Sequence, residues 1–210
     1  MYHFRTGLRR LLLALPLITV IGLPVTAAAQ ESTTPSIALI NDRVIQDIRT
    51  FLGNEVVSLS LKAANKRRSG ISQEEILSLD AQWRKERDAD GAQPLIATAL
   101  GSPVSTYLLR VQSASGGLYS EIFVMDANGL NVGQSTVTSD YWQGDEAKVQ
   151  KTFDVGAGVV FIDEAEYNSE RGIWVAQVNL TLDSAGEPVG SGTIEINLTE
   201  LQRRRALGLS

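Results

Sequence analysis

The pattern of apolar positions divides the chain into a helical first half and a strand-rich second half. In residues 36–65 apolar side chains recur every three or four positions, which predicts one long amphipathic helix with Ser36 as its cap. The apolar positions are Ile37, Ile40, Val44, Ile45, Ile48, Phe51 and Leu52 and, beyond Gly53, Val56, Val57, Leu59 and Leu61. A helix of this kind can cover a sheet or pair with a copy of itself.

Two more helices are predicted before residue 115. Ser72 and Glu75 have the spacing of a capping box, which predicts a helix that ends near Asp88. Ser102 followed by Pro103 is typical of a helix start, and that helix should continue through residue 111. The basic stretch 66–70 lies between the first two helices and is interpreted as a solvated loop.

The second half is predicted to form strands. Residues 121–126 are mostly apolar and end at the turn sequence Asp-Ala-Asn-Gly, so the chain should return over 130–135 as an antiparallel hairpin. Further strands are predicted at 159–162, 173–182 and 189–196, with a short helix over 145–153 and a C-terminal helix capped by Asn197 or Thr199.

The strand 173–182 alternates clearly and should therefore be half buried. Its apolar positions are Trp174, Ala176, Val178, Leu180 and Leu182, and its polar positions are Gln177, Asn179 and Thr181. About five strands after a helical lead predict an α+β domain, with one antiparallel sheet and helices packed on it. We expect a helical part over 36–114 and a sheet part over 118–201.

The composition of the chain predicts an N-terminal leader followed by a single domain. The chain has 210 residues, of which 43% are hydrophobic and 20% charged, which is typical of one globular domain. In residues 1–29 three arginines precede an apolar run, and alanines 27–29 follow it, as in a cleavable signal peptide. We therefore expect a signal peptide (1–29), a flexible lead (30–35) and one domain (36–210) exported to the periplasm. An uncleaved membrane anchor is the alternative.

The residue types exclude several chemistries. There is no cysteine, and the only histidine, His3, lies in the predicted leader. Histidine- or cysteine-based catalytic triads, disulfides, the usual zinc sites and haem ligation by histidine are therefore excluded from the mature chain. Loss of the leader leaves 16 basic and 24 acidic residues, a net charge of −8, which argues against nucleic acid as a partner. We expect no cofactor and no metal.

The densest group of chemically active side chains follows the predicted hairpin. It consists of Asp140, Tyr141, Trp142, Asp145, Glu146 and Lys148. Aromatic rings with polar tips make good walls for a small ligand, and neighbouring charges can orient it. The same pattern is also typical of rings that cover a sheet edge beside solvated charges, and the residues alone leave both interpretations open.

The stretch EIFVMDANGLNVGQSTVTSDYWQGDEAKVQKTF, residues 121–153, is similar to that of small periplasmic Cache-like proteins, whose fold is also termed PDC or PAS-like. The resemblance implies an extracytoplasmic sensor with a long N-terminal helix that commonly mediates dimerisation. It also implies a ligand held between the sheet and the segment after the first hairpin. By position that site would contain Asp140, Tyr141, Trp142, Asp145 and Lys148, with Gln177 and Asn179 from a facing strand. The arginine and tyrosine pattern of amino-acid-binding double Cache domains is not found.

The leading hypothesis is a periplasmic small-molecule binding or sensing module that acts with a membrane receptor or histidine kinase. Lys148 would pair with a ligand carboxylate, or Asp140 and Asp145 with a ligand amine. One alternative is a structural or interaction protein that dimerises through its long helix and binds no ligand. The other alternative is an enzyme with Asp126, Asp140, Asp145 or Glu146 as acid, base or metal ligands. Under the leading hypothesis we expect no enzymatic activity.

Overall fold

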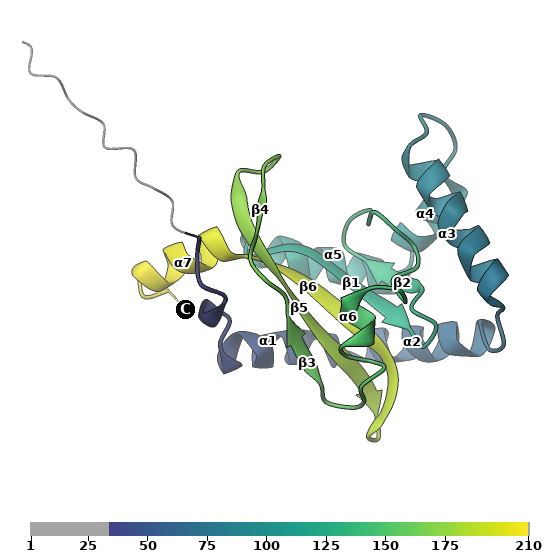
Figure 1. The fold of residues 1–210 in the computed structure, drawn as a ribbon, viewed down its shortest axis with the longest axis horizontal. Helices are drawn as coiled ribbons and strands as arrows, with labels where there is room; N and C mark the ends of the chain where they lie inside the picture. The colour runs from purple at the N-terminus through teal and green to yellow at the C-terminus, as the bar shows by residue number, and fades with distance from the viewer. Residues whose placement is uncertain (1–33, 210) are drawn as a thin grey trace, which may run out of the picture. The chain divides into compact units, whose positions relative to one another are not determined.

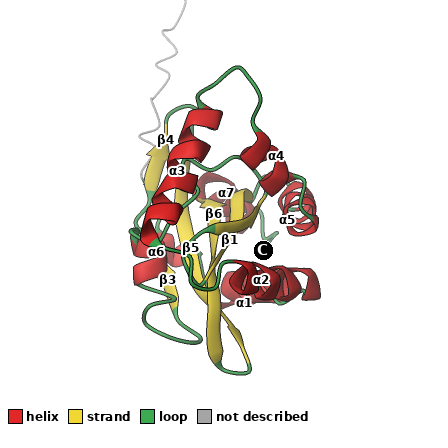
Figure 2. Ribbon diagram, turned by 90° about the vertical axis from the view of Figure 1, so that its right-hand side faces the viewer, coloured by secondary structure: helices red, strands yellow, loops and turns green. Residues whose placement is uncertain are grey.

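A computed structural model describes residues 34–209 and shows, within them, seven α-helices and one six-stranded sheet (Figures 1 and 2). The predicted signal peptide and the lead up to residue 33 lie outside the described residues. None of the helices between residues 34 and 209 is both long enough and apolar enough to cross a membrane.

The helical elements are the 3₁₀ turn η1 (Ile37–Leu39), α1 (Asp42–Leu52), α2 (Glu55–Arg67), α3 (Gln73–Arg87), α4 (Pro94–Leu100), α5 (Pro103–Ala114), α6 (Ala147–Gln150) and α7 (Leu198–Ala206). The strands are β1 (Tyr119–Asp126), β2 (Asn131–Gln134), β3 (Val160–Ile162), β4 (Glu166–Asn168), β5 (Ile173–Ser184) and β6 (Glu187–Asn197). The order of elements confirms a helical first part followed by a sheet.

The sheet has the strand order β2-β1-β6-β5-β3, and β4 also pairs with β5. Every pairing is antiparallel, so the predicted α+β class with one antiparallel sheet is confirmed. The sheet has one strand more than the sequence suggests. Strand β4 pairs with the first half of β5 and β3 with the second half, and three residues are too few for β4 to show an alternating pattern.

The prediction of one helix over residues 36–65 is wrong, because the segment forms two helices. Ser36 caps only the turn η1, while the Asn41 side chain accepts a hydrogen bond from the Val44 N–H and caps α1. Gly53 ends α1, and the Asn54 side chain caps α2. Glycine and asparagine both favour such interruptions, so these local preferences outweigh the continuous apolar periodicity.

Several other boundaries follow the sequence. The capping box of α3 is present in both directions between Ser72 and Glu75, and Ser102 caps α5. Asn197 caps α7 by accepting from the Glu200 N–H. Helix α4, which begins at a proline, was not predicted because its seven residues are too short for a clear period. Helix α6 has four residues in place of the predicted nine.

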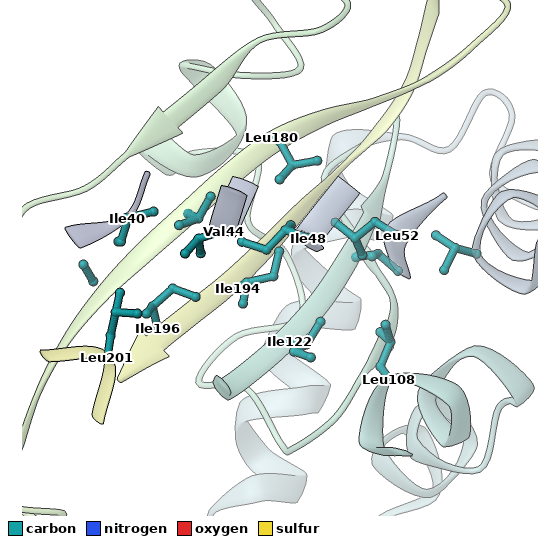
Figure 3. Close-up of a cluster of buried hydrophobic side chains, with 14 of the residues drawn as sticks. Ile40, Val44, Ile48, Leu52, Leu108, Ile122, Leu180, Ile194, Ile196 and Leu201 are labelled. Carbon is teal, nitrogen blue, oxygen red and sulfur yellow. The ribbon is translucent and has the colours of Figure 1, made fainter. Parts of the chain in front are cut away.

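The main core lies on one face of the sheet, against α1, α2, α5 and α7 (Figure 3). From α1 it contains Val44, Ile48 and Leu52, and from the sheet residues such as Ile122 and Ile194. The apolar face of β5 is buried here as predicted. Figure 2 shows α1, α2 and α5 on one side of the sheet and α6 on the other. The apolar face of α1 therefore serves the core, and dimerisation through this region stays a prediction.

Replacing Gly133 with alanine should destabilise the fold by about 1 to 3 kcal/mol. A Cβ atom at this position of β2 would lie 2.4 Å from Cγ1 of Val104 in α5, and a buried valine has little freedom to move aside. Urea unfolding measures the change. The matched control is Gly91→Ala, because a Cβ atom there meets nothing within 4 Å. Equal stabilities of the two variants would contradict the close packing of α5 on β2.

Candidate functional site

The second face of the sheet is polar at its centre and is covered by α6. Phe123 and Met125 of β1 pack there against Val149 and Phe153, from α6 and the segment after it. Beside this apolar contact, alternation along the strands places a set of polar side chains on the same face. They are Glu121 of β1, Gln177, Asn179 and Thr181 of β5, and Ser191, Thr193 and Glu195 of β6.

Three of these residues form a row across the sheet. Glu195 is the cross-strand partner of Glu121 on one side and of Gln177 on the other. Carboxylates that stand directly opposite each other on neighbouring strands repel when both are charged. The row therefore has a built-in electrostatic conflict that a proton or a bound cation would relieve.

A cavity of about 230 Å³ lies between this row and α6. Its lining consists of Glu146, Ala147, Lys148, Asp163, Glu164, Glu166, Val175, Ala176, Gln177 and Glu195. Five of these side chains are carboxylates and one is an ammonium group. We refer to this space as the α6 cavity.

The ammonium group of Lys148 is held at the wall of the α6 cavity. Its Nζ lies 2.9 Å from a carboxylate oxygen of Glu146 and donates to Oε1 of Gln143 at 3.1 Å. It also lies 5.3 Å from the centre of the Phe123 ring, within the range of a cation–π contact. Only 12% of the Lys148 side chain is exposed, so its ammonium group interacts mainly with these neighbours.

Burial changes the titration of both glutamates in the row. It raises the pKa of the Glu121 carboxyl, against the hydrogen bond from the Thr136 hydroxyl, and the charge of Glu195 raises it further. Burial likewise raises the pKa of Glu195, while the Arg171 guanidinium, 3.8 Å away, lowers it. Both carboxyls therefore hold a proton more readily than a solvated glutamate does.

The Glu195→Gln variant should gain stability relative to the wild type as the pH rises. Because the pKa of Glu195 is raised on folding, its stabilising contribution is full below the ordinary value of 4.5 and is lost as the pH rises through the folded value. We expect a relative gain on the order of 1 kcal/mol between pH 4 and pH 7.5. Urea unfolding at both pH values measures it, with the exposed Glu187→Gln on the same strand as control. A difference that does not change with pH would contradict the raised pKa.

The predicted aromatic residues lie in a separate cluster. Tyr141 is buried, with 5% of the residue exposed, and its ring stacks on that of Trp83 with 5.1 Å between the ring centres. The Arg68 guanidinium donates to the Tyr141 hydroxyl at 2.5 Å. Burial raises the pKa of the Tyr141 phenol, against the nearby Arg68 charge. This ring is therefore a packed element of the second hydrophobic cluster.

The hairpin turn is tied to the same cluster through Asp126. Its carboxylate lies 2.6 Å from the Arg68 guanidinium and accepts the backbone N–H groups of Asn128 and Leu130. Gly129 completes the turn with a φ of 76°. The Asp and Asn residues at this position thus form a turn held by an arginine.

Asp80 of α3 fixes the segment that contains the aromatic residues. Its Oδ1 accepts the backbone N–H groups of Tyr141 and Trp142 at 2.9 and 3.1 Å. Its Oδ2 pairs with Arg84 at 2.8 Å, and Arg84 also pairs with Asp140 at 3.0 Å. We use the name clasp for seven residues that these contacts join: Arg68, Asp80, Trp83, Arg84, Asp126, Asp140 and Tyr141.

The six predicted site residues therefore do not lie together. Lys148 and Gln177 line the α6 cavity. Asp140 and Tyr141 belong to the clasp, and Trp142 lies beside it, its indole N–H donating to the Asn128 carbonyl at 2.9 Å. Asp145 is exposed in the turn before α6.

Sequence reasoning missed Glu195 and Asp80, for different reasons. No local pattern indicates Glu195, because its partners come from strand register. Asp80 did carry a signal, since it lies on the buried face of α3 with Ile76 and Trp83, at spacings of four and three. A carboxylate on the apolar face of a helix indicates a buried partner.

No protein-family model matches the chain, and no curated protein is similar enough to match it. Among solved structures, the chain is similar to the ligand-binding domain of an amino-acid chemoreceptor of Pseudomonas aeruginosa PAO1 in complex with GABA. The two are 16% identical over 75% of this chain and 64% of that one, with a TM-score of 0.35. The ligand-binding domain of a Campylobacter jejuni chemoreceptor in complex with 4-methylisoleucine is 15% identical over 74% of this chain and 62% of that one, with a TM-score of 0.38.

A third neighbour is the extracellular domain of a protein described as a histidine kinase, 11% identical over 71% of this chain and 63% of that one, with a TM-score of 0.39. The chain thus spans less than two thirds of each of these structures. These neighbours are domains of sensory receptors, the class that the sequence resemblance indicates. At such TM-scores the ligand and the function are argued from this chain's own residues.

Proposed function

We propose that this protein is a periplasmic small-molecule binding and sensing module of Cache type, with its ligand in the α6 cavity. The observation that carries the proposal is the cavity itself, in which Lys148 and Gln177 meet Glu195 between the sheet and a short helix. Small-molecule sites are concave and have a few polar groups that fix orientation. The α6 cavity has both properties.

The neighbouring elements suggest how binding would be transmitted. Helix α6 has only four residues, and it packs on β1 through Val149, with Phe153 from the segment that follows it. A ligand that contacts Lys148 would therefore bias the position of α6. In this proposal a membrane receptor or histidine kinase reads that change. The predicted export signal supports a periplasmic location for the module.

Two of the carboxylates considered for an enzyme are held in ion pairs. Asp126 and Asp140 are each paired with an arginine, at 2.6 and 3.0 Å. Within residues 34–209 no group of three or more acidic or histidine side chains is arranged to hold a metal ion. We therefore propose binding in preference to catalysis.

The proposal predicts that a small molecule stabilises the purified protein and that Gln177→Ala abolishes the effect. At 100 times its dissociation constant a ligand should add about 2.7 kcal/mol, which a thermal-shift screen of amines, carboxylates, sugars and alcohols detects. The control is Gln150→Ala, an exposed residue of α6 outside the cavity lining. Trp142→Ala separates the two places, because it should leave binding intact if the ligand occupies the α6 cavity. The proposal would be refuted if no compound raises the melting temperature, or if binding is lost only in Trp142→Ala.

A further inference from the structure

Glu121 of β1 and Glu195 of β6 stand directly opposite each other on neighbouring strands. Both lie on the sheet face that α6 covers, and only 16% of the Glu195 side chain is exposed. The Thr136 hydroxyl donates to the Glu121 carboxyl at 2.9 Å. Two carboxylates in this arrangement repel each other when both are ionised, and burial strengthens the repulsion. The pair therefore fits best beneath α6 when at least one of the two carboxyls holds a proton.

The nearby cations reduce this repulsion but do not tie α6 firmly to the pair. The Arg171 guanidinium is half exposed and approaches Glu195 only to 3.8 Å. The Lys148 ammonium of α6 acts on both carboxyls and favours their ionised forms. Its ion pair at 2.9 Å, however, is with Glu146, the residue that precedes α6. Among residues 34–209, Glu121 forms no ion pair.

Burial has a larger effect on this pair than the cations have. It is the strongest influence on each carboxyl, and the pKa of both Glu121 and Glu195 lies above the ordinary value. The other charged side chains of the cavity lining are Asp163, Glu164 and Glu166, all carboxylates. A proton therefore favours the state in which the pair is covered, and ionisation favours a state in which water reaches it. The preference for the covered state is full below the ordinary value of 4.5 and is lost as the pH rises through the raised values.

Helix α6 depends on the sheet beneath it for its position. It has four residues, and its N-terminus has no side-chain cap. A single helical turn has little stability of its own. Its apolar attachment consists of Val149, with Phe153 from the segment that follows, packed against Phe123 and Met125. A change in the charge of the sheet beside this attachment will therefore act on α6 more than on the long strands.

We propose that α6 is a proton-controlled lid on the α6 cavity. The lid is closed, as in the structure, when the Glu121 and Glu195 pair holds at least one proton, and it lifts when both carboxyls are ionised. Where it concerns access of a ligand, this inference rests on the proposed function. The lid itself is tested without a ligand, so the two can fail separately.

Hydrogen exchange of the ligand-free protein, followed by mass spectrometry at pH 5 and pH 7.5, measures the lid. After correction for the intrinsic pH dependence of amide exchange, protection of residues 147–153 should fall as the pH rises, while that of β5 and β6 should not. A pKa difference of one unit between the closed and lifted states changes their ratio about tenfold, so we expect a fall of at least about fivefold. Unchanged protection overturns the inference. Protection that rises with pH also overturns it, because attraction between Lys148 and the ionised glutamates would then dominate.

Matched variants test the carboxyl pair. Glutamine keeps the shape of the side chain but cannot ionise, so Glu121→Gln with Glu195→Gln should give α6 the same protection at both pH values. The control is Glu187→Gln, exposed on β6, which should keep the full response to pH. The single variant Glu195→Gln should show a smaller response than the wild type, and it provides the same test if the double variant does not fold. A response as large as that of the wild type in a folded variant overturns the role of the pair.

Discussion

Replacing Arg68 with methionine should destabilise the protein by about 3 to 5 kcal/mol. The carboxylate of Asp126 has no exposed surface and lies 2.6 Å from the Arg68 guanidinium. Methionine preserves the apolar stem but leaves that charge buried without a cation. The same substitution removes the donor to the Tyr141 hydroxyl and the contacts to the Asn131 carbonyl. Urea unfolding with far-UV circular dichroism measures the loss.

The neighbouring Arg67→Met is the matched control for Arg68. Arg67 is exposed at the end of α2, so its replacement should change stability by no more than about 0.5 kcal/mol. Adding Asp126→Asn to Arg68→Met should restore part of the lost stability, because it removes the buried charge. A loss below 1 kcal/mol in Arg68→Met, or no recovery in the double variant, would argue against the clasp as an electrostatic unit.

Trp83→Ala should cost a similar amount, about 3 to 5 kcal/mol. The indole is fully buried, stacks on Tyr141 and donates its N–H to the Thr138 carbonyl at 2.9 Å. Alanine leaves a cavity between α3 and the segment after β2, and it leaves a buried carbonyl without its donor. Thermal unfolding by calorimetry reports the loss directly.

Trp142→Ala provides the comparison for Trp83. The Trp142 ring is only partly buried and lies over Gly129 and Gly144, so its removal should cost less than that of Trp83. Neither ring lines the α6 cavity, so both variants should lose stability without losing ligand binding. Greater destabilisation by Trp142→Ala than by Trp83→Ala would contradict the view that Trp83 contributes more to packing.

The clasp and the α6 cavity are connected by a short piece of chain. Asp80 fixes the backbone at residues 141 and 142, and α6 begins at residue 147. The clasp therefore anchors one end of the segment that covers the cavity. The stability measurements test the clasp, and the ligand-binding experiments test the α6 cavity.

The sequence by itself determined the features that depend on neighbouring residues. The capping box at Ser72 and the turn at Gly129 are local, because each needs only a few residues and one backbone conformation. The alternation in β5 likewise predicted which of its side chains enter the main core. The α+β class followed from the sum of these local signals.

Local signals also explain where the sequence misled. The apolar period of residues 36–65 continues across Gly53 and Asn54, but the backbone conformation at these two residues ends one helix and begins another. The group around Tyr141 and Trp142 has the composition of a ligand wall, and the Tyr141 ring packs on Trp83 of α3, so a ligand role for these rings stays a prediction. Composition does not distinguish the two, because the same rings serve both purposes.

Only the tertiary structure decided the candidate site. Glu121, Gln177 and Glu195 are distant in sequence and meet through the register of three antiparallel strands. A shift of one residue in either pairing would move a side chain to the opposite face. The hairpin turn sets the register between β5 and β6, but β1 and β6 are distant in sequence and no turn joins them. The partners of Asp80, Arg68 and Asp126 depend in the same way on how α2 and α3 pack. The sequence specified the elements, and packing selected which of their polar groups face one another.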